Sequence, residues 1–214
     1  MVHKGERRPR GRPRAYEPTR ALAQATGAFW QVGYSGTSLD QLSDATDMNR
    51  PSLYAAFGDK HSLYLQTLER YIQNANSTIA VALDRALPLV EGLRRFYAAA
   101  LATYLPSGAG ARGCYLIGTA LTEAPGDTEV RAKVLGALRQ FDRALLLRLQ
   151  YAVEQGELSA AADPKALAMM ASAVLHTLAI RSRAGESRAA LQSIVDTAIG
   201  VMAGGGGRKK SRAR

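Results

Sequence analysis

The chain has 214 residues, of which 47% are hydrophobic, and it carries a formal net charge of +10. This apolar content is enough for a packed core and excludes a disordered protein, and the single cysteine excludes an internal disulfide framework. The N-terminal stretch MVHKGERRPRGRPR lacks the apolar segment of a secretory signal, and no run approaches the roughly 18 apolar residues of a membrane span. A cytoplasmic protein that does not enter a membrane is therefore expected.

The positive charge is concentrated at the two ends of the chain. Residues 1–20 contain seven Lys/Arg and two acidic residues, residues 204–214 contain five Lys/Arg and no acidic residue, and the remainder has sixteen of each sign. We expect residues 1–16 to form a disordered basic arm and residues 204–214 to form a flexible basic tail. Two basic ends around a neutral body indicate a polyanionic partner, and the alternative is that they only aid solubility.

The chain between these ends is predicted to be all-α, because alanine and leucine dominate it and β-branched runs are scarce. Pro18 suits the first turn of the first helix and Gly33 ends it, while Thr37 can cap the second helix with Asp40 three residues later. Three short helices are expected at about 17–33, 37–45 and 50–57, followed by six others at about 59–86, 89–105, 114–124, 127–158, 164–183 and 187–202. This makes about nine helices, divided into an N-terminal domain (17–60) and a helical bundle (61–203).

The third helix is too short to be stable alone, so Leu53 and Phe57 are expected to hold it by packing. A short helix, a three-residue turn and a second short helix match the helix-turn-helix, whose second helix enters the major groove of DNA. On its opposite face, Arg50 can pair with guanine, Ser52 can bond a base or a phosphate, and Ala55 can contact a thymine methyl. The sequence therefore predicts that this face binds double-stranded DNA.

The segment GYSGTSLDQLSDATDMNRPSLYAAFGDKHSLY resembles the DNA-binding domain of the TetR family of transcriptional regulators, with the resemblance covering residues 18–65. The resemblance implies a homodimer, a C-terminal domain that binds an unidentified small molecule, and an operator as the DNA partner. The sequence departs from the family pattern at Ala55 and Ala56, where larger side chains are common. The resemblance also implies phosphate contacts from Thr37, Tyr54 and Lys60, and positions near the bases for Asn49, Arg50, Pro51 and Ser52.

The arm contains PRGRPR, which resembles the core of an AT-hook. In such a strip, arginines beside a glycine lie in the narrow minor groove of A·T-rich DNA, where negative potential is concentrated. Arg10, Arg12 and Arg14 are therefore expected to contact the minor groove.

The bundle is expected to provide both a dimer interface and a ligand pocket. Apolar stripes on the last two helices fit an interface between two copies, although core packing within one chain explains them equally well. Their members are Leu167, Met170, Val174, Leu175 and Leu178, and then Leu191, Ile194, Val195, Ala198 and Val201. The pocket candidates are polar or aromatic residues of the bundle: Tyr97, Tyr104, Tyr115, Thr119, Thr122, Glu123, Phe141, Tyr151, Met169, His176 and Thr177.

Cys114 follows Arg112 and Gly113 at a predicted helix N-terminus, where the helix dipole and the cation would favour the thiolate. This position makes a redox-sensing or electrophile-sensing switch conceivable, and the alternative is a small buried thiol.

No catalytic site is predicted. The stretch GAGARG (108–113) matches a dinucleotide-binding motif in letters, but a helix precedes it where such a site needs a strand. The three histidines share no metal-ligand spacing with the cysteine, and no cofactor is predicted. The sequence indicates a ligand-responsive transcriptional regulator, most consistent with a repressor released from a palindromic operator. The alternatives are an architectural DNA-binding protein driven by its basic ends, a regulator that senses through Cys114, and an enzyme or carrier built on a helical bundle.

Overall fold

The computed structural model of the protein describes residues 18–108 and 110–204. The described part of the chain contains nine α-helices and no strand, which confirms the predicted all-α fold. The helices are α1 (Pro18–Gly36), α2 (Leu39–Thr46), α3 (Arg50–Phe57), α4 (Lys60–Ala82), α5 (Leu89–Tyr104), α6 (Tyr115–Thr122), α7 (Thr128–Glu154), α8 (Pro164–Arg183) and α9 (Arg188–Met202). The predicted arm, and all of the predicted tail except Gly204, lie outside the described residues.

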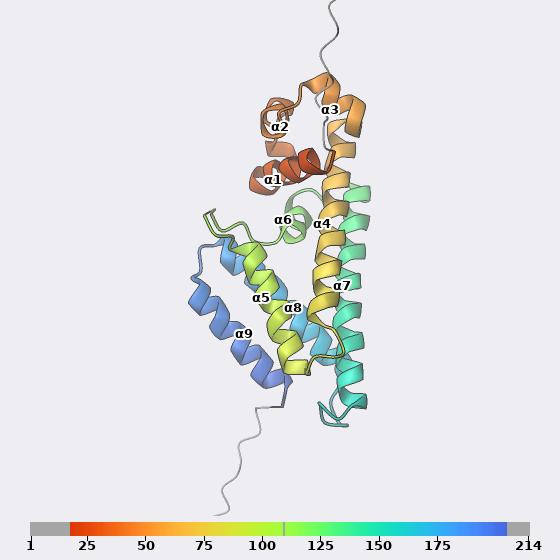
Figure 1. The fold of residues 1–214 in the computed structure, drawn as a ribbon, viewed down its shortest axis with the longest axis vertical. Helices are drawn as coiled ribbons and strands as arrows, with labels where there is room; N and C mark the ends of the chain where they lie inside the picture. Colours follow the sequence, from red (N-terminus) through yellow and green to blue (C-terminus); the bar gives the residue numbers. More distant parts are fainter. Residues whose placement is uncertain (1–17, 109, 205–214) are drawn as a thin grey trace, which may run out of the picture.

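The first three helices form a small unit at one end of the molecule, and α4 extends from this unit into the bundle (Figure 1). The helical path of α1 is broken at Gly33, whose φ of 79° and ψ of 175° suit a residue without a Cβ atom. The prediction that Thr37 caps α2 is wrong by one residue. Ser38 is the N-cap and forms a capping box with Gln41, whereas the Thr37 hydroxyl donates back to the Gly33 carbonyl.

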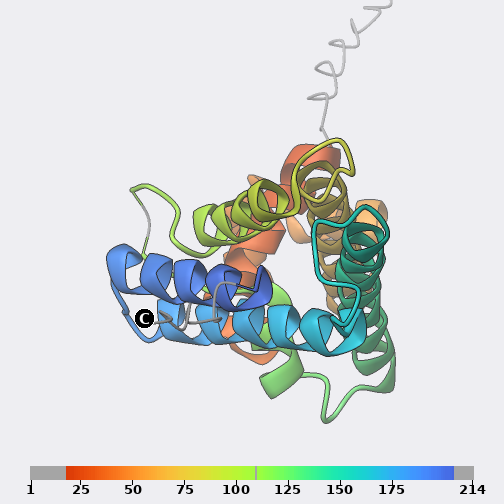
Figure 2. The ribbon, with the colours of Figure 1, turned by 90° about the horizontal axis from the view of Figure 1, so that it is seen from below.

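In the bundle, α7 packs along α4 on one side and along α8 on the other, and α5 contacts both α8 and α9. Viewed along the long axis, α8 and α9 lie side by side, and α8 also packs against α7 (Figure 2). The short α6 lies where the bundle meets α1, and it contacts α1, α4, α7 and α8. The N-terminal unit therefore touches the bundle through α6 as well as through α4.

Several predicted helices end earlier in the structure than in the sequence pattern. The helix α4 ends at Ala82 because Asp84 accepts backbone bonds from Ala86 and Leu87 and forms a turn before Pro88. The helix α7 ends at Glu154, and Gly156 then adopts a φ of 73°. Asp59, Asp163 and Ser187 are the N-caps of α4, α8 and α9, and the side chain of each accepts a backbone N–H of its helix.

One ion pair between a buried arginine and a partly exposed glutamate ties the far end of the bundle together. The guanidinium of Arg148, on α7, is 2% exposed and lies 3.0 Å from a carboxylate oxygen of Glu157. It also donates to the Leu87 carbonyl, while the backbone N–H of Leu89 donates to Glu157. Burial alone would raise the pKa of Glu157, but the bonds from Arg148 and from the Leu89 amide hold that pKa below its usual value.

Candidate nucleic-acid interface and bundle cavity

The two faces of α3 differ as the sequence predicts. Leu53 and Phe57 are buried at 3% and 6% exposure, and they hold the two-turn helix against its neighbours. The opposite face presents Arg50, Pro51, Ser52, Tyr54, Ala55 and Ala56 to solvent. A solvent-exposed face on the second helix of a helix-turn-helix is the geometry that a major-groove reader needs.

Two side chains at the start of α3 are held before any partner arrives. The Asn49 side chain caps the helix by accepting the Ser52 backbone N–H at 2.9 Å. The Arg50 guanidinium donates from Nε at 3.0 Å and from Nη2 at 2.6 Å to one Asp40 oxygen on α2. Arg50 and Asp40 are both exposed, so a polyanion can compete with Asp40 for the Arg50 guanidinium.

The residues expected at phosphates lie in different settings. Tyr54 is 46% exposed, and Lys60 lies with Nζ 4.3 Å from the centre of the Tyr34 ring at the start of α4. Thr37 is instead buried, with its hydroxyl donating to the Gly33 carbonyl at 2.6 Å. The exposed neighbour Ser38, which the sequence analysis did not select, stands at the N-terminus of α2, where backbone N–H groups favour anions.

Polar contacts join the N-terminal unit to the bundle. The Glu123 carboxylate, at the end of α6, accepts the Ser35 backbone N–H at 3.4 Å and its hydroxyl at 3.2 Å. The guanidinium of Arg183, at the end of α8, donates to the Gln31 carbonyl on α1 at 3.2 Å and to the Arg112 carbonyl at 3.0 Å. These bonds connect the break in α1 to two bundle helices.

We call the contact of α1 with α6 and α8 the joint, and Trp30 lies at its centre. Its indole N–H donates to the Arg112 carbonyl at 3.2 Å, and the Arg112 guanidinium lies 4.8 Å from its ring centre. Its ring meets the Tyr71 ring edge-on, with the centres 5.1 Å apart. Trp30 belongs to α1 and also lines the cavity inside the bundle, so the N-terminal unit forms part of that cavity's wall.

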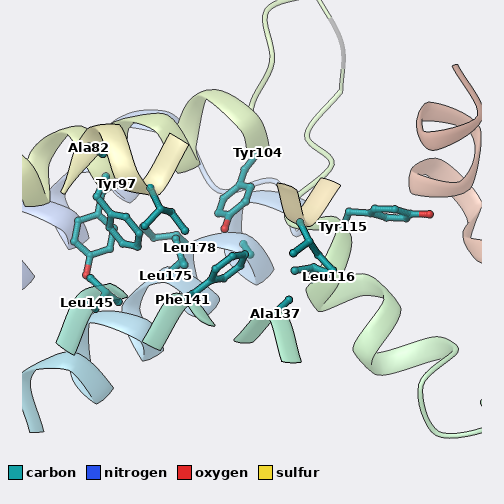
Figure 3. Close-up of a cluster of buried hydrophobic side chains, with 14 of the residues drawn as sticks. Ala82, Tyr97, Tyr104, Tyr115, Leu116, Ala137, Phe141, Leu145, Leu175 and Leu178 are labelled. Atoms are coloured by element: carbon teal, nitrogen blue, oxygen red, sulfur yellow. The ribbon is translucent and has the colours of Figure 1, made fainter. Parts of the chain in front are cut away.

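The bundle cavity has a volume of about 280 Å³. Of the predicted pocket residues, Tyr104, Phe141 and His176 line it, as does Cys114. Figure 3 shows Tyr104 and Phe141 facing one another from α5 and α7. The helix α4, which supplied none of the predicted pocket residues, also lines the cavity with Tyr71, Asn74, Ala75, Thr78, Ile79 and Ala82. The available signal was Ile79 and Ala82, two apolar residues on the buried face of this amphipathic helix, whereas Asn74 and Thr78 are exposed and line the cavity from its solvent side.

A second cavity, of about 420 Å³, lies at the joint between α1, α6 and α8. It includes the predicted residues Tyr115, Thr119 and Thr122. The Thr119 hydroxyl is 3.0 Å from that of Tyr64. Burial raises the pKa of Tyr64 to about 12, although that bond to Thr119 lowers it slightly. Trp30, Cys114 and Ile117 line both cavities, so the two spaces adjoin.

The other pocket candidates do not line the main cavity. Tyr97 is fully buried, with its ring packed in the core, and its hydroxyl donates to the Ala171 carbonyl at 3.0 Å. Glu123 belongs to the joint, and Tyr151 lies beside the guanidinium of Arg85. Met169 and Thr177 are on the outer face of α8.

The environment of the main cavity favours the uncharged forms of Tyr71, Tyr104 and His176. Burial raises the pKa of Tyr71 and of Tyr104, and the neighbouring Cys114 raises both further. The Tyr71 hydroxyl lies 3.4 Å from the Cys114 sulfur, at the N-cap of α6. Burial lowers the pKa of His176, and the more distant Asp142 only partly offsets this. His176 Nε2 is buried and has no hydrogen-bond partner in the described part of the chain.

The predicted apolar stripes on α8 and α9 are used mainly within one chain. Leu178, Leu191 and Val195 are buried in the core, so these members pack inside the chain. Other apolar side chains on the same two helices remain exposed, among them Met169 at 65%, Ile180 at 55% and Val201 at 55%. These exposed residues are the ones available to a second copy.

A helix-turn-helix unit joined to a helical bundle with an internal cavity defines a class of protein, the DNA-binding regulator that contains a small-molecule site. Two family models match the chain: "Bacterial regulatory proteins, tetR family" over residues 21–67, and "Tetracyclin repressor-like, C-terminal domain" over residues 90–198. The chain belongs to the TetR family and is a ligand-responsive, DNA-binding transcriptional regulator.

Individual relatives agree with this assignment. The chain is 30% identical to the HTH-type transcriptional repressor ComR of Escherichia coli (strain K12), over 89% of this chain and 90% of ComR. A cysteine variant of the TetR family regulator CifR, solved with 26-bp double-stranded operator DNA, is 31% identical with a TM-score of 0.79, covering 88% of this chain and 98% of that one. Regulatory protein TetR from Rhodobacter sphaeroides is 25% identical with a TM-score of 0.76, over 85% and 97% of the two chains. In the described part of this chain, no helix is long and apolar enough to cross a membrane.

Proposed function

We propose that the protein is a homodimeric repressor that binds a palindromic operator and leaves it when a small molecule enters the bundle cavity. ComR, which is named a repressor, supports the direction of control, and CifR, which is solved on operator DNA, supports operator binding. In this proposal residues 17–60 form the DNA-binding domain, residues 61–203 form the ligand-binding and dimerisation domain, and Met169, Ile180 and Val201 contribute to the interface.

The proposed base contacts come from the exposed start of α3. Arg50 exchanges Asp40 for a base or phosphate, and Ser52 contacts a neighbouring group, while Asn49 and Pro51 fix the start of the helix near the bases. Phosphates are contacted by Tyr54 and Lys60 and by the start of α2, where the buried side chain of Thr37 leaves Ser38 as the exposed hydroxyl. Arg10, Arg12 and Arg14 are proposed to lie in the adjoining minor groove.

Release of DNA is proposed to start at Trp30. A ligand in the cavity contacts the wall that Trp30 forms, and Trp30 lies three residues before the break in α1 at Gly33. Movement of this wall would change the bonds that Arg183 and Glu123 make to α1 and so alter the spacing of the two DNA-binding domains in the dimer. A coupling of about 1–3 kcal/mol between the two sites is typical of such systems.

We further propose that the protein works by binding alone, without catalysis, and that it acts in the cytoplasm where bacterial DNA lies. The relatives are transcription regulators, which supports this reading.

The observation that carries the proposal is the exposed polar face of α3, held by Leu53 and Phe57 in a helix-turn-helix. The test is fluorescence anisotropy of the full chain at ~150 mM salt, with DNA flanking its own gene and with random DNA, because salt suppresses nonspecific phosphate binding. Arg50→Ala and Tyr54→Ala should each weaken specific binding at least tenfold, whereas Arg143→Ala, on the exposed face of α7, should change it less than twofold. An architectural protein would instead bind both DNAs equally and would lose binding only when both basic ends are removed.

A further inference from the structure

The chemistry of the cavity wall limits which molecules can bind in it. None of the described residues that line it is Asp, Glu, Lys or Arg. A charged ligand would lose its hydration there without gaining a partner of opposite charge, which costs several kcal/mol. The cavity therefore selects against carboxylates, phosphates and ammonium ions.

Shape and lining indicate an aromatic occupant. Aromatic rings approach the cavity from four helices: Trp30 on α1, Tyr71 on α4, Phe96 and Tyr104 on α5, and Phe141 on α7. A dry cavity of about 150 Å³ holds one benzene molecule, so a space of about 280 Å³ fits a molecule of one to two rings. Edge-to-face and offset contacts with such rings add to the apolar burial.

One polar atom of the wall lacks a partner. His176 lies on α8 and lines the cavity, and its buried Nε2 makes no hydrogen bond within the described chain. A buried ring nitrogen without a partner is unfavourable, and a ligand hydroxyl or carbonyl would satisfy it. Other polar groups of the wall have partners: the Tyr71 hydroxyl lies 3.4 Å from the Cys114 sulfur, and the Thr78 and Thr103 hydroxyls donate to carbonyls of their own helices.

We propose that the cavity binds an uncharged aromatic molecule of one to two rings that bears a single hydrogen-bonding oxygen, and that His176 bonds this oxygen. The inference rests on the proposed ligand-responsive function, since it names the chemical class of the effector. The specificity comes from two features: the absence of ionic side chains excludes charged analogues, and His176 distinguishes the oxygenated ring from the bare one.

The test is calorimetry of the full chain at pH 7.5 with three probes of one ring system: 2-naphthol, naphthalene (by displacement) and 2-naphthoate. We expect 2-naphthol to bind about tenfold more tightly than naphthalene, the value of one hydrogen bond, and 2-naphthoate to bind at least a hundredfold more weakly than 2-naphthol. His176→Phe should remove the preference for naphthol and leave naphthalene binding intact. The same replacement outside the cavity, His61→Phe, should change nothing in this assay.

Further controls keep the outcomes distinct. Ala100→Phe, which fills the cavity from α5, should abolish binding of every probe while operator binding persists; if His176→Phe fails to fold, this variant and the wild-type probe series still decide the question. Binding of 2-naphthoate as tight as that of 2-naphthol, or failure of all three probes, would overturn the assignment. Sequence-specific DNA binding without probe binding would refute this inference alone, while probe binding without specific DNA binding would refute the proposed function.

Discussion

Replacing Leu53 by alanine should disable DNA binding without touching any residue proposed to contact DNA. The helix α3 has eight residues, and an isolated helix shorter than roughly 12–15 residues is marginal in water, so packing of Leu53 and Phe57 must hold it. Leu53 is 3% exposed, and truncating a buried leucine to alanine costs about 2–5 kcal/mol. Because α3 lies at the end of the molecule, where its neighbours can partly close the gap, we expect the lower half of that range, about 2–3 kcal/mol.

The assay is urea denaturation followed by circular dichroism, together with operator anisotropy on the same preparations. About 2.8 kcal/mol corresponds to a hundredfold change in the local folding equilibrium, which should be visible as weaker operator binding. Leu121→Ala is the matched control, since that leucine is 72% exposed on α6 and its truncation should change stability by less than about 0.5 kcal/mol. The reasoning is refuted if Leu53→Ala is no more destabilising than Leu121→Ala, or if it binds the operator like the wild type.

Other changes give independent expectations. Glu157→Gln should destabilise the bundle by about 2 kcal/mol in urea denaturation, because it leaves the buried Arg148 guanidinium without its charge partner. The control is Glu91→Gln, which breaks an exposed ion pair, and equal losses of stability in the two variants would contradict the role of burial. The free energy of unfolding should fall as the pH drops below about 6.5, because the lowered pKa of His176 in the folded chain means that the unfolded chain binds a proton more readily at this histidine. The slope of unfolding free energy against pH should shrink in His176→Phe, and an unchanged slope would count against this cause. Arg183→Gln should reduce the effect of a cavity ligand on operator affinity several-fold, while ligand affinity in the absence of DNA should stay within twofold of the wild type. If anisotropy shows the same ligand effect in this variant as in the wild type, Arg183 does not couple the two sites.

The local features of the fold were predictable from sequence because short-range chemistry determines them. Asp59, Asp163 and Ser187 cap the helices that they precede, and Leu53 and Phe57 are buried as their spacing predicts. The error at Thr37 has the same origin: two adjacent hydroxyl residues both suit a cap, and only the path of the chain after Gly33 decides between them.

The cavity was predicted only in part, because its walls come from helices that are distant in sequence. Three of the pocket candidates line the cavity (Tyr104, Phe141 and His176), but Tyr97, which has a similar local pattern, lies in the core. Periodicity shows which residues face inward and cannot distinguish a packed neighbour from an open space. The place of Trp30 in the cavity wall follows only from the tertiary contact between α1 and the bundle.

The measurement that tests the central claim most directly is a nuclease footprint of the full chain on the DNA flanking its own gene, beside random DNA, at ~150 mM salt. We predict one protected palindromic site made of two half-sites, which disappears in Leu53→Ala and persists in Leu121→Ala. Equal protection of the flanking and random DNA, or protection that survives the loss of Leu53, would contradict the account.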